Sequence, residues 1–323
     1  MIKKNKKIYT VALIGCGRIG FWYDQGKKLA KPLSHFSAFY HSKNFNLIAV
    51  AETNNQTRKH IKDSFSVKVY SDYRELLKRE RPEVVVIASP DETHRQALLT
   101  ALEYKPLLVF CEKPLAGNLA EVTDIVKRYQ RQGVPLLVNF TRRFLKEYSD
   151  IKRMINRGQF GKLQNVTVCC SRGLVHNFIH YLDLCLWYFG QPKKIIYESE
   201  RPGLMANDPT INLTMLYPNG LEIRLFSMDS SNLLVHELDI MGDKARIKIE
   251  AEINLSEYGV GRRLDLYKEF KGFVLKKTAI IDKAKVAGNA VEHIYRHLTK
   301  REPLASPASQ SVEIFKLIKR IKQ

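Results

Sequence analysis

Several features that mark particular classes of protein are scarce or absent in this sequence. No uncharged apolar run approaches the ~20 residues that a membrane-spanning helix needs, which argues against an integral membrane protein. We also find no internal repeat and no low-complexity segment. The cysteines are odd in number and form no CxxC pair, which argues against a disulfide framework or a structural zinc site and favours a reducing cytoplasm; they are Cys16, Cys111, Cys169, Cys170 and Cys185.

Acidic residues are few relative to basic ones. The 33 Asp and Glu residues face 53 Lys and Arg residues, which leaves a formal net charge of +20. Such an excess can indicate a nucleic acid, an anionic lipid or a phosphorylated ligand as partner. The basic residues are dispersed, however, and no zinc-finger spacing, aromatic–basic RNA motif or heptad zipper accompanies them. We therefore expect no nucleic-acid partner, and we interpret the basic start of the chain as a tail before the first strand.

The first 140 residues alternate short apolar runs with amphipathic stretches that predict helices, such as Asp72–Arg81, Thr93–Tyr104 and Leu119–Gln132. Several runs are apolar on both faces, as in the VVVIA sequence of residues 84–88, which is typical of a parallel sheet covered by helices. This alternation predicts an α/β fold with a doubly wound, Rossmann-like sheet in a domain of residues 1–140. The predicted strands are Tyr9–Gly15, Phe45–Ala51, Val67–Tyr70, Val84–Ala88, Leu107–Cys111 and Pro135–Phe140.

The pattern changes after residue 140. Helices are predicted at Phe144–Arg157 and around Phe178–Phe189, and most of the chain from there to residue 282 has a β pattern. Two turns, Pro218-Asn219-Gly220 and Gly242-Asp243, predict hairpins. We expect residues 141–323 to form an α+β domain with a large, mostly antiparallel open sheet, used for substrate binding and for assembly as a homodimer or homotetramer. Its predicted strands are Leu163–Ser171, Thr210–Tyr217, Leu221–Met228, His236–Met241, Ala245–Glu250, Arg262–Phe270 and Lys276–Asp282.

A glycine-rich turn follows the first predicted strand. Its GxGxxG pattern permits a tight turn, a close approach of the backbone to a pyrophosphate and close packing of helix on strand. The helix expected next would offer its free N–H groups to the phosphates. The position of the motif at the first strand–helix junction makes it a specific sign of dinucleotide binding; its residues are Gly15, Cys16, Gly17, Arg18, Ile19 and Gly20.

Glu52 follows the second predicted strand. A carboxylate at that point accepts hydrogen bonds from the adenosine ribose and repels a 2′-phosphate, so NAD is favoured over NADP. Along the sequence, Glu52 is farther from Gly20 than the usual separation of ~20 residues. We interpret Phe21–Ser34 as an insertion that accounts for the extra length. Arg58 offers an alternative, because it can pair with a phosphate.

Glu112, Lys113 and Pro114 end the fifth predicted strand. Ligands of open parallel sheets bind at the carboxyl ends of the strands, so these residues should face the cofactor. A lysine there can hydrogen-bond a substrate hydroxyl and lower its pKa through its charge. Pro114 would hold Lys113 in place.

These elements occur in the order seen in one family. The sequence resembles the glucose–fructose oxidoreductase / inositol dehydrogenase / MocA (Gfo/Idh/MocA) family over nearly its whole length, most weakly in the strands beyond Gly190. The segments that carry the resemblance are the glycine turn, Glu52, Ser89–His94, Glu112–Pro114, Asn139–Phe144 and the helix with His180–Asp183.

The resemblance implies a two-domain NAD(P)-dependent dehydrogenase of sugars, cyclitols or related polyols. In that family the lysine, here Lys113, contacts nicotinamide and substrate, and a histidine that maps to His180 is the acid/base. Family members often carry an aspartate four residues earlier, where this chain has His176, followed by Asn177. On an α-helix positions 176 and 180 share a face, so both imidazoles are expected at one pocket. The role of His176 in place of the aspartate is left open, as is a capping role.

Several other residues near these motifs are candidates for ligand binding. Arg142 and Arg143 either clamp an anionic group of the substrate or form ion pairs at a helix start. Ser89, Pro90 and His94 are expected to line the cofactor side. A metal site at the two histidines and Asp183 fits the spacing alone, and we expect no metal.

The sequence therefore predicts a cytoplasmic oxidoreductase. It would transfer a hydride between NAD, or less favourably NADP, and a secondary alcohol of a sugar, sugar nucleotide or cyclitol, and its small-molecule substrate is expected to be anionic. The alternative is a non-catalytic dinucleotide-binding or sensor protein with the same fold. The sequence does not name the substrate, the pathway or the direction of hydride transfer.

Overall fold

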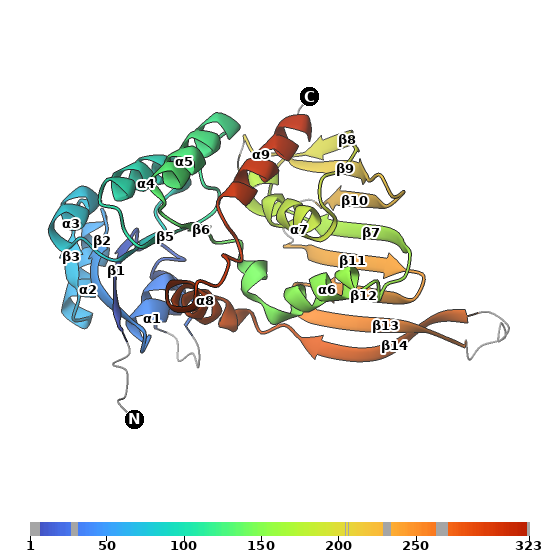
Figure 1. Ribbon diagram of the computed structural model, residues 1–323, viewed down its shortest axis with the longest axis horizontal. Coiled ribbons are helices and arrows are strands. Elements are labelled where there is room, and N and C mark those ends of the chain that lie inside the picture. Colours follow the sequence, from blue (N-terminus) through green and yellow to red (C-terminus); the bar gives the residue numbers. More distant parts are fainter. Residues whose placement is uncertain are drawn as a thin grey trace. The chain divides into compact units, whose positions relative to one another are not determined.

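A computed structural model of the chain describes residues 7–26, 32–203, 205, 207–228, 234–262 and 271–321. The chain divides into two compact units (Figure 1). Unit 1 comprises residues 1–144 and 284–315, and unit 2 comprises residues 145–283 and 316–323.

Unit 1 is built on a six-stranded parallel sheet. The strand order is β3-β2-β1-β4-β5-β6. From β1 at the centre, β2 and β3 add successively on one side, and β4, β5 and β6 add on the other side. This is the doubly wound arrangement that the alternating pattern predicts. The strands are β1 (Tyr9–Ile14), β2 (Phe45–Ala51), β3 (Lys68–Tyr70), β4 (Val84–Ile87), β5 (Leu108–Cys111) and β6 (Leu136–Val138).

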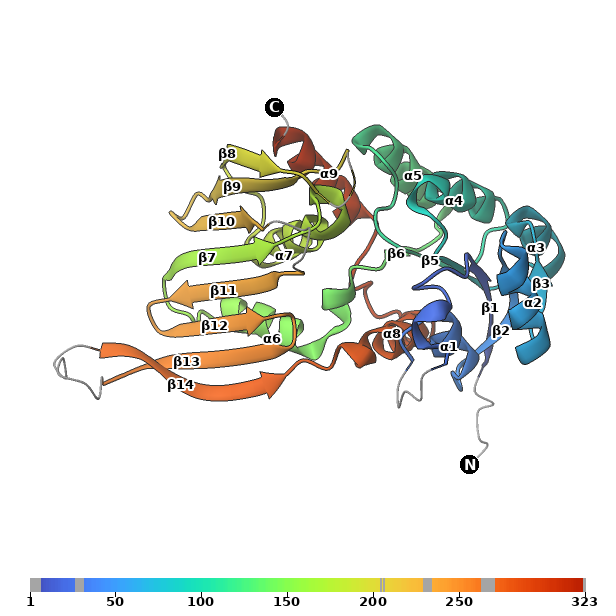
Figure 2. The same cartoon turned by 180° about the vertical axis from the view of Figure 1, so that it is seen from behind.

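Helices cover both faces of this sheet. Two of them, α1 and α8, pack against each other, and α4 contacts both α3 and α5 (Figures 1 and 2). The core strands are buried because both faces are covered: every residue of β4 and β5 is inaccessible to solvent. The helices are α1 (His35–Tyr40), α2 (Asn55–Ser64), α3 (Tyr73–Glu80), α4 (His94–Glu103), α5 (Leu119–Gln132) and α8 (Val286–Lys300).

The chain returns to unit 1 near its end, which differs from the single boundary expected after residue 140. The helix α8 packs on α1 and on the 3₁₀ turn η3 (Thr141–Phe144), so residues 284–315 group with the first unit and not with the second. The segment before α9 (Ser309–Ile321) also bridges the edge strand β6, where Pro307 pairs with Leu137. Patterns of local periodicity do not reveal such a return, because it depends on long-range contacts.

Unit 2 is built on an eight-stranded sheet in the order β14-β13-β12-β11-β7-β10-β9-β8. All neighbours are antiparallel except β7 and β10, which confirms the predicted open, mostly antiparallel sheet. The strands are β7 (Leu163–Cys170), β8 (Lys194–Arg201), β9 (Thr210–Leu216), β10 (Glu222–Ser227), β11 (His236–Gly242), β12 (Ala245–Glu250), β13 (Asn254–Arg262) and β14 (Lys271–Ile280).

Two helices of unit 2, α6 (Lys146–Asn156) and α7 (Ile179–Phe189), lie on the same face of this sheet, and Figure 2 shows the opposite face. Both hairpins are where their turns predict them, between β9 and β10 and between β11 and β12. The predicted strand Arg262–Phe270 falls mostly outside the described residues, and the strands that flank it, β13 and β14, pair with each other.

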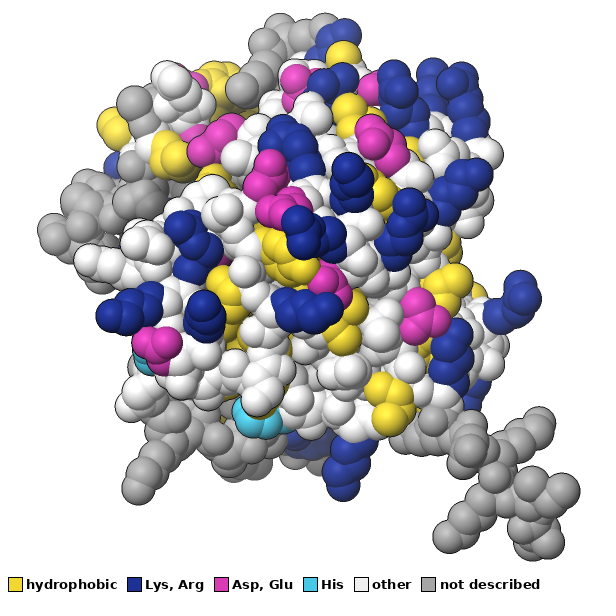
Figure 3. Space-filling view, turned by 90° about the vertical axis from the view of Figure 1, so that its left-hand side faces the viewer, with side chains coloured by type: hydrophobic (Ala, Val, Ile, Leu, Met, Phe, Trp, Pro, Cys, Tyr) yellow, Lys and Arg dark blue, Asp and Glu magenta, His cyan; other side chains and the backbone are white. Residues whose placement is uncertain are grey.

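Lysine and arginine side chains are dispersed on the face seen in Figure 3. They lie among acidic and apolar side chains there. Among the residues that the structure describes, no helix is both long and apolar enough to cross a membrane.

Candidate active site

The glycine turn at the end of β1 has the geometry that close approach of a ligand requires. Gly15 has a φ of +91°, and a Cβ there would lie 2.4 Å from the backbone nitrogen of Ser89. A Cβ on Gly20 would lie 2.3 Å from the carbonyl oxygen of Gly15. A Cβ on Gly17, in contrast, meets no atom within 4 Å, so the space over Gly17 is open. Gly15 thus permits the tight turn, Gly20 permits close packing, and Gly17 leaves room for the approach of a pyrophosphate.

The helix expected after this turn is interrupted. One helical turn forms, with the Phe21 N–H donating to the Gly17 oxygen (2.8 Å), and then the 3₁₀ turn η1 (Trp22–Asp24) follows. Helical bonding resumes only at α1, where the N–H groups of His35 and Phe36 donate to the oxygens of Ile19 (3.0 Å) and Gly20 (2.9 Å). These bonds agree with the interpretation of Phe21–Ser34 as an insertion.

Glu52 lies directly after β2 and reaches the glycine turn. Its Oε2 accepts the backbone N–H of Cys16 at 2.8 Å, and its Oε1 accepts the N–H of Asn54 at 2.7 Å. The guanidinium of Arg58 donates to the backbone oxygen of Glu52 (2.9 Å) and to that of Thr53. The carboxylate is therefore fixed beside the open space over Gly17, where it retains lone pairs for the ribose hydroxyls of a dinucleotide. These residues fit a bound dinucleotide.

Glu112, the residue before Lys113, is the centre of a hydrogen-bond network at the end of β5. Its Oε1 accepts from Nε2 of His35 (2.7 Å) and from Nδ2 of Asn139 (2.6 Å), and its Oε2 accepts the N–H of Lys113 (3.3 Å). Burial opposes the charge of this carboxylate, but the hydrogen bonds from His35 and Asn139 and the nearby Lys113 outweigh it and lower the pKa of Glu112. Glu112 is therefore an ionised anchor for the Lys113 loop.

His94 holds the other side of this loop. It is fully buried at the start of α4, where Nδ1 lies 2.7 Å from the oxygen of Pro114 and Nε2 lies 2.9 Å from the oxygen of Ser89. The peptide bond between Lys113 and Pro114 is cis. His94 thus ties the loop after β4, which includes Pro90, to the loop after β5. Unit 1 brings the glycine turn, Glu52, Ser89 and Lys113 to one edge of its sheet, as predicted from the strand order.

The two arginines after β6 are more buried than ordinary surface residues. Arg142 is 6% and Arg143 is 8% exposed, and both belong to η3. Arg143 donates through Nη1 to the backbone oxygen of Ala305 at 3.2 Å, in the segment between α8 and α9. This contact binds the returning chain to unit 1, so part of the Arg143 guanidinium has a structural role.

His176 and His180 lie in consecutive helical segments of unit 2. His176 is in the π-helical turn η4 (Leu174–Phe178), and His180 is the second residue of α7. The sequence predicts that both histidines lie on one α-helix. The structure corrects this, because the segment that carries His176 is π-helical. The Nδ1 atom of His180 is buried.

A carboxylate that the sequence did not single out lies at the start of η4. The two oxygens of Asp208 accept the N–H groups of Val175 and His176, each at 2.8 Å. The side chain of Asn177 points elsewhere and donates to the oxygen of Ser171 at 3.0 Å. Asp208 therefore caps the segment that precedes His180.

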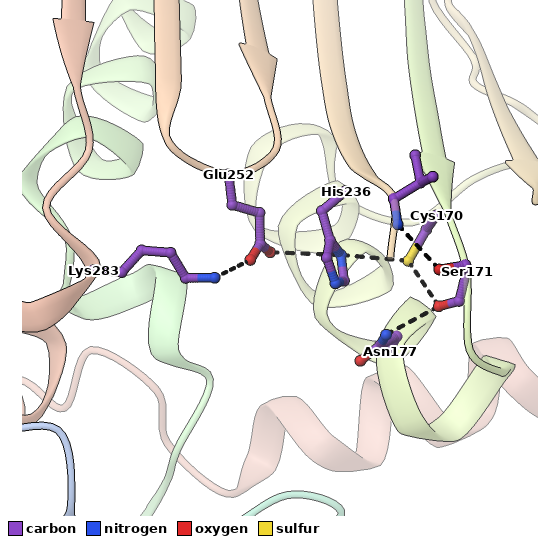
Figure 4. A network of polar contacts seen from close by, with 7 residues as sticks. Cys170, Ser171, Asn177, His236, Glu252 and Lys283 are labelled. Carbon is purple, nitrogen blue, oxygen red and sulfur yellow. Dashed lines mark hydrogen bonds and ion pairs between the residues drawn. The ribbon is translucent and has the colours of Figure 1, made fainter. Parts of the chain in front are cut away.

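A second polar network crosses the same end of the sheet of unit 2 (Figure 4). The carboxylate of Glu252 binds Nζ of Lys283 and lies 3.7 Å from Nδ1 of His236, which is 3.6 Å from Sγ of Cys170. The network continues from Cys170 to Ser171 and Asn177. The strand register explains this gathering, because the end of β7 pairs with the start of β11. In the described ranges, no group of three or more His, Cys, Asp or Glu side chains is arranged to hold a metal ion.

The fold and the glycine turn define an NAD-binding Rossmann domain joined to an open-sheet domain. The model of the family described as "Oxidoreductase family, NAD-binding Rossmann fold" (GFO_IDH_MocA) matches residues 9–140. Residues 9–140 are therefore similar to the NAD-binding domain of the Gfo/Idh/MocA oxidoreductases.

Individual relatives and solved structures are similar to larger parts of the chain. The chain is 29% identical over 214 residues to inositol 2-dehydrogenase of Mycolicibacterium smegmatis, and the match covers 60% of this chain and 61% of that protein. The dehydrogenase MviM from Clostridium difficile has the same fold, with a TM-score of 0.76 at 16% identity over 98% of this chain and 99% of that one. The WlbA dehydrogenase from Bordetella pertussis, solved with NADH and UDP-GlcNAcA, has a TM-score of 0.75 at 16% identity over 98% and 96%.

Proposed function

We propose that the chain is an NAD-dependent dehydrogenase of a secondary alcohol in a sugar, sugar nucleotide or cyclitol. The observation that carries the proposal is the lysine loop of unit 1, in which Glu112 and His94 hold Lys113 at the carboxyl end of β5, the edge that also has the glycine turn. Relatives named inositol 2-dehydrogenase and a structural neighbour solved with a sugar nucleotide support the substrate class.

Residues of unit 1 are suited to bind the dinucleotide. The backbone of the glycine turn would take the pyrophosphate over Gly17, with Arg18 and Ile19 beside it, and Glu52 would accept the ribose hydroxyls. When bound, the nicotinamide accepts the hydride that leaves the alcohol carbon. Because a carboxylate repels a 2′-phosphate, we propose NAD rather than NADP as the preferred cofactor.

The roles of Lys113 and His180 follow from their chemistry. The ammonium of Lys113 donates to the reacting oxygen and stabilises the alkoxide that forms as hydride leaves. His180 takes the hydroxyl proton; because its Nδ1 is buried, we assign the transfer to Nε2. An imidazole suits this task, since its unperturbed pKa of about 6.5 is close to working pH. We also propose that Arg142, which is buried, positions an anionic substituent of the substrate.

The test is turnover of a panel of polyols, sugar acids and sugar nucleotides with NAD, beside titration of NADH followed by nicotinamide fluorescence. A dehydrogenase binds NADH and reduces NAD with at least one member of the panel, and His180→Asn lowers that rate by about two orders of magnitude or more. Tight NADH binding without turnover on any member would instead support the dinucleotide-sensing alternative. Absence of NADH binding would refute both.

A further inference from the structure

The backbone between β7 and η4 has an unusual conformation at a residue other than glycine. Arg172 has a φ of +76° and Gly173 has a φ of +95°. Glycine adopts positive φ at little cost, whereas an arginine there is strained by its Cβ. Such strain persists only where the surrounding structure holds it, and it is concentrated at functional sites.

The neighbours of Arg172 are held firmly on both sides. Before it, the Oγ of Ser171 accepts the N–H of Val235 (3.1 Å), and the Ser171 oxygen accepts from the side chain of Asn177 (Figure 4). After it, the Gly173 N–H donates to Oγ1 of Thr210 (2.8 Å). The carboxylate of Asp208 caps the next turn, and a Cβ on Gly173 would lie 2.3 Å from it. The backbone at Arg172 therefore has little freedom to relax.

The side chain of Arg172 is half-buried and has no counter-ion among the described residues. Its Nε is buried without a hydrogen-bond partner, and within the part of the chain that the structure describes no carboxylate pairs with its guanidinium. A buried donor without an acceptor is costly, more so when it is charged. Lys283, a cation of the polar network at this end of the sheet, does have a counter-ion, because it forms an ion pair with Glu252.

Arg172 also lies close in sequence to the residues proposed for chemistry. It follows the end of β7 by two residues and precedes His176 by four residues and the proposed base His180 by eight. A strained, unneutralised guanidinium at this position is suited to an anionic group of a ligand. A single guanidinium matches a carboxylate well, because its planar fork donates two parallel hydrogen bonds to the two oxygens.

We propose that Arg172 is a specificity-determining residue that binds a carboxylate of the substrate. The substrate would then be a sugar acid, free or within a sugar nucleotide. This inference rests on the proposed function and adds to it the acidic group that the substrate carries.

The test compares Arg172→Gly with Arg301→Gly in the full-length chain saturated with NADH. Arg301 is a matched control, because it is exposed and has a φ of +55° at the end of α8. Glycine relieves the strain at both positions, so both variants should have a thermal midpoint equal to or above that of the wild type. Binding of D-glucuronate, D-glucose and glucose 6-phosphate is then measured by titration calorimetry.

We expect the wild type to bind glucuronate more tightly than glucose, and Arg172→Gly to weaken glucuronate alone by roughly 10- to 100-fold. Arg301→Gly should leave all three affinities unchanged. Wild-type binding of glucuronate no tighter than glucose, or undiminished binding in Arg172→Gly, would overturn the inference. Glucose 6-phosphate bound more tightly than glucuronate, and lost in Arg172→Gly, would overturn the choice of a carboxylate. If Arg172→Gly turns over neutral polyols as fast as the wild type and binds glucuronate equally well, this inference is wrong but the proposed function still holds.

Discussion

At the scale of single residues, Glu52 determines the expected choice between the two nicotinamide dinucleotides. Its carboxylate lies at the glycine turn, where the 2′-phosphate of NADP would meet a like charge. We expect the wild type to bind NAD more tightly than NADP, and Glu52→Ser to narrow that difference by roughly tenfold or more. The two dissociation constants can be measured by fluorescence titration with the reduced dinucleotides.

A matched control for this prediction is Glu103→Ser. Glu103 is exposed at the end of α4, which leads into the amino end of β5 and hence to the other edge of the sheet. This variant should leave both affinities unchanged. A wild-type preference for NADP would contradict the assignment of Glu52.

Single residues also show where sequence reasoning reached the site and where it did not. Glu52 and Lys113 were predictable because their positions follow directly from strand ends. The role of His35 was not predictable, because no motif in the sequence connects it with Glu112. Asp208 and Arg172 carry no motif; Asp208 reaches η4 from a separate loop, and the positive φ of Arg172 is invisible in the sequence.

At the scale of elements, the helix after β1 is interrupted, and we propose that the glycine turn is the main determinant of dinucleotide binding. Its glycines can be tested separately, because Gly17 faces open space and Gly20 contacts the oxygen of Gly15. Gly17→Ala should fold normally and weaken NADH by roughly tenfold, since its methyl group occupies the approach of the pyrophosphate. Gly20→Ala should lower the free energy of unfolding by about 1–3 kcal/mol, because its methyl group overlaps backbone.

Thermal unfolding and NADH titration of both variants would separate the two effects. Unchanged NADH affinity in a folded Gly17→Ala variant would contradict the placement of the pyrophosphate. An undiminished thermal midpoint in Gly20→Ala would contradict the close packing described for that residue.

The elements themselves were predictable where hydrophobic periodicity was strong. The prediction of Thr93–Tyr104 agrees with α4, and that of Leu119–Gln132 agrees with α5. Weak patterns concealed others: β8 is mostly exposed, and β13 contains two glycines and polar residues. Strands with one face exposed to solvent give a weaker signal than strands that are buried on both faces.

At the scale of the whole molecule, the uncovered face of the large sheet bears on assembly. The sequence predicts assembly of the open-sheet domain as a homodimer or homotetramer. The central strands β11 and β12, however, carry ion-paired residues, such as Asp239 with Arg246. Other strands of the sheet carry exposed apolar side chains. Among them are Phe226 (40% exposed) on β10 and Phe273 (36% exposed) on β14. A dimer or tetramer through this face would therefore combine polar and apolar contacts.

Light scattering over a range of protein concentrations tests this assembly. We expect the mass of a dimer or tetramer, and we expect Phe226→Glu to reduce it while leaving NADH binding intact. A monomer at high micromolar concentration would count decisively against self-association.

The central claim is that Lys113 acts directly on the reacting alcohol. Its loop is anchored by Glu112 and His94, whereas the dinucleotide contacts are assigned to the glycine turn and Glu52. Removing the charge should therefore affect chemistry far more than cofactor binding.

The most direct test is the turnover number of Lys113→Met, measured as NADH formation on the best substrate of the panel, with NAD affinity measured in parallel. We predict a fall in turnover of about two to three orders of magnitude, as is typical when one electrostatic donor is lost, with a much smaller change in NAD affinity. Full activity in Lys113→Met would contradict the assignment.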